Sequence, residues 1–144
     1  MKAIILLFLI GFSLSYNRDK AISYAKRFCK NYNTRFNNYK GKWGESSNFI
    51  SQCLIAGGMT LSNCATADDK GCVFDSNTLR ACLSKKGWRH TKTRPFSFKA
   101  GDIIFKGTKV FFASYVNGNT IRVYAHDEDL CDENIDTTDV MYFY

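Results

Sequence analysis

Three consecutive polar residues, Glu45, Ser46 and Ser47, stand where apolar spacing predicts the start of a buried helix from about Ser46 to Ala56. The N-terminus of such a helix carries partial positive charge and free backbone N–H groups. It lowers the pKa of a thiol and can stabilise an oxyanion, as amide hydrolysis requires. A general base must come from another element, and His126, after an alternating stretch, is a candidate.

Each of these residues also has a structural interpretation. Ser46 is a preferred helix-capping residue, and a cap needs no catalysis. His126 stands beside Asp127 and can be a hydrogen-bonded histidine of the core instead of a base. His90 lies in a polar stretch, and we expect it at the surface.

Two further polar residues, Asn48 and Gln52, lie four apart and therefore share one face of the predicted helix. They can donate hydrogen bonds to a bound peptide or oxyanion, or they can bind loop backbone and hold the fold. Before the helix, Trp43 ends a loop in which aromatic residues alternate with cations. That mixture suits stacking on sugars or bases, although loop aromatics also fold back onto a core.

The elements around this helix predict an α+β fold, with N-terminal helices packed on a small antiparallel sheet. Helical spacing runs from Asn17 to about Tyr32 and from about Asn77 to Lys86. Asn17 can cap the first of these helices, and Asp75 or Ser76 the second.

After Gly87 the apolar period changes to two, which predicts strands. The predicted strands span residues 88–91, 102–105, 110–116, 120–125 and 140–143. Asn117 and Gly118 form a strong hairpin signal between two of them.

The first 15 residues predict a cleaved signal peptide, because Lys2 precedes an apolar run too short for a membrane span and small residues follow it. We therefore expect one secreted domain over residues 16–144, with no transmembrane segment. Its six cysteines, in an oxidising compartment, predict disulfides, for which 15 pairings are possible. A bond between Cys64 and Cys72 would close a short loop. Cys53 lies on the apolar stripe of the helix, which favours a disulfide or core role.

Charge is unevenly distributed along the chain. Lysines and arginines total 20 against 13 acids, and seven of those acids lie between Asp127 and Asp139. The acidic segment lacks the calcium-loop pattern, so we expect a solvated loop and neither metal nor cofactor. The basic remainder can attract anionic cell walls, membranes or nucleic acid, or it can simply keep the protein soluble.

Four blocks of the sequence, YNRDKAISYAKRF, SSNFISQCLIAGG, GDIIF and YAHDED, resemble the putative amidase domain family. Its members belong to the papain-like cysteine peptidase and cell-wall amidase group, so the resemblance implies that fold. The family motif Asp-Cys-Thr-Asn-Phe aligns its nucleophilic cysteine with Ser46. Its general-base histidine aligns with Phe111, or with the neighbouring Val110 or Lys109, and a further histidine is matched by His126.

The resemblance thus implies an amidase scaffold that lacks the nucleophile and the base. Serine is a poor nucleophile at neutral pH without an adjacent base, and Phe111 cannot accept a proton. We predict an inactive domain whose cleft binds a peptide, glycan or protein, such as a cell-wall glycopeptide. The candidate binding residues are Trp43, Asn48, Gln52 and Phe111, which we expect beside Ser46. The alternatives are an active amidase or peptidase that uses Ser46 with His126, and a basic effector that acts on membranes or nucleic acid.

Overall fold

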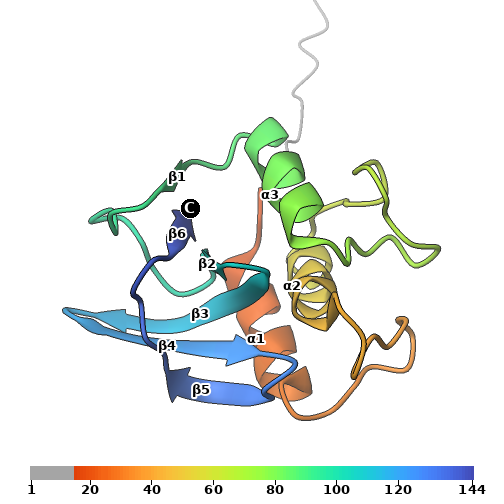
Figure 1. Ribbon diagram of the computed structural model, residues 1–144, viewed down its shortest axis with the longest axis horizontal. Coiled ribbons are helices and arrows are strands. Elements are labelled where there is room, and N and C mark those ends of the chain that lie inside the picture. Colours follow the sequence, from red (N-terminus) through yellow and green to blue (C-terminus); the bar gives the residue numbers. More distant parts are fainter. Residues whose placement is uncertain (1–14) are drawn as a thin grey trace, which may run out of the picture.

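The computed structural model describes residues 15–144, so the predicted signal peptide lies outside the described residues apart from Ser15. Three helices come first and six strands follow, which confirms the predicted α+β class. The helices lie together on one side of the molecule and the strands on the other (Figure 1). The papain-like arrangement within this class stays a prediction. None of the described helices is long and apolar enough to cross a bilayer.

Two of the helices begin at the predicted side-chain caps. Helix α1 spans Arg18–Phe28, and the side chain of Asn17 accepts the N–H of Lys20 at 3.0 Å. Helix α3 spans Ser76–Lys85, and the carboxylate of Asp75 accepts the N–H of Thr78 at 2.8 Å. These caps bind N–H groups that the first turn cannot pair internally.

Helix α2, Glu45–Ala56, begins one residue before the predicted start and has a different cap. Its N-cap is Gly44, at a φ of 103°, and no side chain caps it. The expectation that Ser46 or Ser47 caps this helix is therefore wrong, because both lie inside its first turn. All residues from Glu45 to Leu54 are buried, so α2 is the central helix of the domain.

The six strands form one antiparallel sheet in the order β1-β6-β2-β3-β4-β5. The strands are β1 His90–Thr91, β2 Ile103–Lys106, β3 Lys109–Asn117, β4 Thr120–Ala125, β5 Leu130–Asn134 and β6 Met141–Phe143. The hairpin predicted at Asn117 and Gly118 joins β3 to β4. Strand β5 was not predicted, since its residues lie in the segment expected to be an acidic loop.

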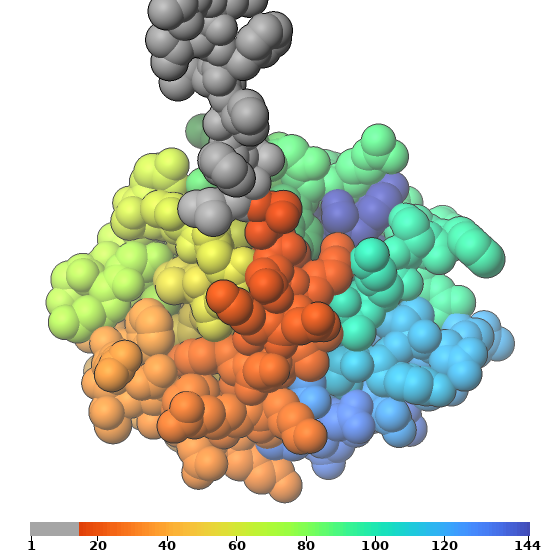
Figure 2. All heavy atoms as spheres, turned by 180° about the vertical axis from the view of Figure 1, so that it is seen from behind, coloured from red at the N-terminus to blue at the C-terminus, as the bar shows by residue number. Residues whose placement is uncertain are grey.

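The alternation along β2 and β3 gives each face of the sheet its own apolar cluster. Val110 and Phe112 join the main core, which includes Phe49 of α2. Phe111 and Ile104 belong to a second cluster on the opposite face. Helix α2 packs between α1 and β3, and from behind α1 runs over the surface beside the strands (Figure 2).

Disulfides join Cys29 to Cys131 and Cys64 to Cys82. The suggested bond between Cys64 and Cys72 is therefore wrong, because helix α3 brings Cys82 to Cys64 instead. Cys53 and Cys72 are buried free thiols. Of the two roles expected for Cys53, disulfide or core, the structure therefore shows the core role. Burial raises the pKa of both thiols, which keeps them protonated.

The turn before α2 predicts an effect of glycine substitution. A Cβ at Gly44 would overlap the carbonyl oxygen of Phe74, whereas one at Gly87, at a φ of 93°, meets open space. Gly87→Ala should lower the free energy of unfolding by about 1–3 kcal/mol, from backbone strain alone. Gly44→Ala should lower the free energy of unfolding clearly more, as measured by urea unfolding. The start of α2 must also move to relieve the overlap with Phe74. Equal losses in the two variants would contradict this account of the helix start.

Candidate functional site

Ser46 lies in the first turn of α2 with 3% of its surface exposed. Its Oγ accepts a hydrogen bond from the backbone N–H of Val110, at 3.2 Å. Since Val110 is on β3, this contact joins the start of the helix to the sheet. Within residues 15–144 no side-chain base is hydrogen-bonded to the Ser46 hydroxyl.

The imidazole of His126 lies near α2, but its two nitrogens face other groups. Nε2 lies 2.6 Å from the carbonyl oxygen of Phe28 and must donate its proton there, because a carbonyl can only accept. Nδ1 lies 2.8 Å from Oε1 of Glu45. The ring also stacks on Phe49, with centroids 3.8 Å apart. The hypothesised contact between Ser46 and His126 is therefore not formed, and the structural interpretation of His126 is the one that this geometry favours.

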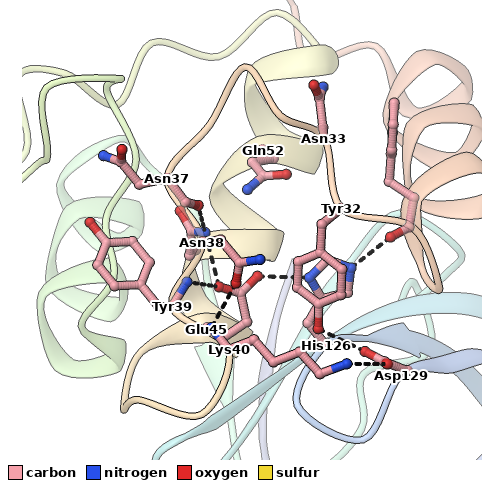
Figure 3. Close-up of polar contacts among 12 residues, drawn as sticks. Tyr32, Asn33, Asn37, Asn38, Tyr39, Lys40, Glu45, Gln52, His126 and Asp129 are labelled. Atoms are coloured by element: carbon pink, nitrogen blue, oxygen red, sulfur yellow. Dashed lines mark hydrogen bonds and ion pairs between the residues drawn. The ribbon is translucent and has the colours of Figure 1, made fainter.

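Glu45 is fully buried, and each of its carboxylate oxygens has a partner. Oε1 faces His126, while Oε2 accepts the N–H of Tyr39 at 2.7 Å and the side-chain amide of Asn48 at 3.2 Å. A carboxylate removed from water is strongly unfavourable unless it is paired and hydrogen-bonded in this way. Figure 3 shows Glu45 between the backbone of Tyr39 and the imidazole.

The loop between α1 and α2 covers this pair. The Tyr32 ring lies 4.2 Å from the His126 ring, and its hydroxyl donates to Asp129 at 2.9 Å. Lys40 reaches the other oxygen of Asp129, at 3.2 Å (Figure 3). These contacts place loop side chains over the outer side of the imidazole.

Asn48 and Gln52 bind other parts of the fold. The Asn48 amide donates to the carbonyl of Asn37 at 2.8 Å, as well as to Glu45. Gln52 accepts the hydroxyl proton of Tyr24, at 2.7 Å. These contacts support the prediction that Asn48 and Gln52 hold the fold together, and not the prediction that they bind a ligand.

A cavity of about 220 Å³ opens at the N-terminus of α2. Trp43 and Phe74 supply apolar walls, and Ser46, Lys109 and Asp127 are among the polar residues that line it. Trp43 is 70% exposed. We call this cavity, lined by residues 43–44, 46–47, 74–77, 108–109 and 127, the cleft.

One buried polar group of the cleft has no partner. The Oγ of Ser47 is inaccessible to solvent and forms no hydrogen bond within the part of the chain described. Ser47 is itself a lining residue, 1% exposed. A buried hydroxyl without a partner is costly, so a ligand atom that reached it would be stabilised.

Two charged side chains, Asp127 and Lys109, line the cleft at the N-terminus of α2. Burial together with nearby Glu45 raises the pKa of the Asp127 carboxyl group. Lys109 forms an ion pair with Glu128 at 2.5 Å. The helix terminus is therefore already facing an anionic side chain of the protein itself.

Phe111 does not line the cleft. Its side chain lies in the second apolar cluster, because neighbouring strand residues point to opposite faces of the sheet. The expectation that Phe111 approaches Ser46 is corrected accordingly: Val110 contacts Ser46, and Lys109 lines the cleft.

The sequence profile described as putative amidase domain matches residues 15–130. This chain belongs to the putative amidase domain family. The matched residues of this amidase domain contain the whole of α1, α2 and α3, the cleft and the Glu45–His126 pair. No curated protein and no solved structure matches the chain.

Sequence reasoning missed three residues that shape the amidase-domain site. Glu45 was noted only as a neighbour of Ser46, Lys109 only as an alternative alignment, and Asp127 only as part of an acidic loop. For Glu45, complete burial of its carboxylate is the informative feature, and it depends on the tertiary structure.

The buried pair predicts a stability difference between two carboxylate variants. Glu45→Ala leaves His126, Asn48 and the Tyr39 N–H without their partner, so the free energy of unfolding should fall by about 3–5 kcal/mol. Glu128→Ala removes an exposed ion pair and should cost less than about 1 kcal/mol. Urea unfolding of both variants measures the contrast, and a loss under 1 kcal/mol in Glu45→Ala would refute the central role of the pair.

Proposed function

We propose that this protein is a secreted, catalytically inactive amidase-like domain that binds a peptide or glycopeptide in the cleft without cleaving it. The observation that carries the proposal is the hydrogen bonding at Ser46, whose oxygen accepts a backbone N–H and, within residues 15–144, is not hydrogen-bonded to a side-chain base. The family assignment supports the amidase-like part of the proposal.

Hydrolysis by a serine requires that another group take its proton during attack. The imidazole of His126 is bonded to Glu45 and Phe28, and it cannot accept the proton of Ser46 in that position. The other aligned positions, Lys109 and Val110, offer a cation in an ion pair and an apolar side chain. Removing members of a catalytic unit typically lowers the rate by several powers of ten.

Oxyanion stabilisation is weakened as well. The carboxylate of Asp127 lines the cleft together with Ser46, so a developing negative charge would meet a resident one. An active serine hydrolase, the first alternative, therefore lacks both proton transfer and a free anion site in this geometry.

The binding part of the proposal rests on the shape and lining of the cleft. The exposed indole of Trp43 offers a flat apolar surface, and the exposed side chain of Asn77 offers a polar contact. A few polar groups in an otherwise enclosed pocket are typical of ligand sites. Secretion is supported by the two disulfides, which form and persist in oxidising compartments.

Catalysis is tested first. The purified domain, incubated with acetylated peptide amides and with peptidoglycan fragments, should release no amine above a protein-free control. Ser46→Ala should be indistinguishable from the wild type. Hydrolysis that disappears in Ser46→Ala would overturn the proposal of inactivity.

Binding is tested by isothermal titration calorimetry with the same fragments. Trp43→Ala should weaken affinity at least about tenfold, or about 1.4 kcal/mol, because the stacking surface is lost. Phe96→Ala removes an exposed aromatic side chain outside the cleft and serves as the control. Affinity that is unaffected by Trp43→Ala but falls steeply with salt would favour the charge-driven effector instead.

A further inference from the structure

A second cavity, of about 570 Å³, adjoins the cleft. Asn77 on α3 and Thr108 in the β2–β3 turn line both cavities, so the two meet at these residues. Beyond that point the lining includes Arg80, Lys92 and Asp139. The β2–β3 turn lies next to α3 in Figure 1, in agreement with this arrangement.

Arg80 is held rigidly in this second cavity. Its guanidinium lies over the Phe105 ring, 4.8 Å from the centroid, and one of its N–H groups donates to the carbonyl of Gly107 at 3.1 Å. Its Nε is buried and has no hydrogen-bond partner among residues 15–144. A guanidinium has five N–H donors, so donors remain available to a ligand.

The charges around Arg80 favour an anion. Within the described part of the chain neither Arg80 nor Lys92 forms an ion pair. Among the described residues that line this cavity, Asp139 is the one acidic side chain, whereas Arg80 and Lys92 are two cations. The fixed, stacked guanidinium loses little conformational freedom when it binds a carboxylate, and its fork geometry matches one.

We propose that Arg80 and Lys92 bind a carboxylate group, and that the ligand of the cleft is therefore a peptide or glycopeptide with a free carboxylate. The second half of this statement rests on the proposed function, whereas the carboxylate site itself does not. The amide-containing part of such a ligand lies in the cleft, and the carboxylate lies beyond Asn77 and Thr108.

The site alone is tested with succinate, at an ionic strength held constant with chloride. Succinate should raise the thermal midpoint of the wild-type domain, because a ligand that binds only the folded state stabilises it. Arg80→Gln should abolish that rise and Lys92→Gln should reduce it. Arg35→Gln removes the same charge from an exposed loop and should leave the rise intact. No rise in the wild type, or an equal rise in Arg80→Gln, would overturn the carboxylate site.

The ligand class is tested with acetylated peptides that carry either a free or an amidated C-terminus. The free acid should bind the wild type at least about tenfold tighter, and Arg80→Gln should remove the preference while Arg35→Gln keeps it. Equal binding of both peptides would refute this inference but leave the cleft proposal standing. If neither peptide binds while succinate still acts through Arg80, the cleft proposal and the ligand class fail, and the carboxylate site remains.

Discussion

The buried contact between Glu45 and His126 is the constraint on which the rest of this domain depends. It joins the first residue of α2 to the end of β4, and the other imidazole nitrogen joins that point to the last residue of α1, Phe28. The Cys29–Cys131 disulfide fixes the neighbouring residues to β5. A carboxylate inside a protein must be compensated, so the loop that brings the Tyr39 N–H to it is held in place as well.

The same contact directs both nitrogens of the His126 imidazole to groups other than the Ser46 hydroxyl. An imidazole that donates to a backbone carbonyl and faces a buried carboxylate is positioned by the fold and is not directed at Ser46. The helix terminus favours negative charge near Ser46, but a favourable field does not remove a proton. Asp127, which lines the cleft together with Ser46, already brings a carboxylate to this terminus.

The surface around the cleft does not depend on catalysis. The start of α2, the start of α3 and the β2–β3 turn contribute to the cleft and the neighbouring cavity. The two cavities share Asn77 and Thr108 as lining residues. These segments are held by the core beneath them, including the fully buried Phe49 and Phe105. The shape of the cleft therefore follows from this framework.

Local chemistry in the sequence determined the α+β class, the caps at Asn17 and Asp75, and the hairpin at Asn117 and Gly118, because these features depend on neighbouring residues. The edge strand β5 was not predicted, because its acidic residues do not favour a strand. It forms a strand through its pairing with β4. The tertiary structure alone decided the disulfide pairs and the direction of the His126 ring. The two partners of that ring lie 81 and 98 residues away, and only packing brings groups so distant into contact.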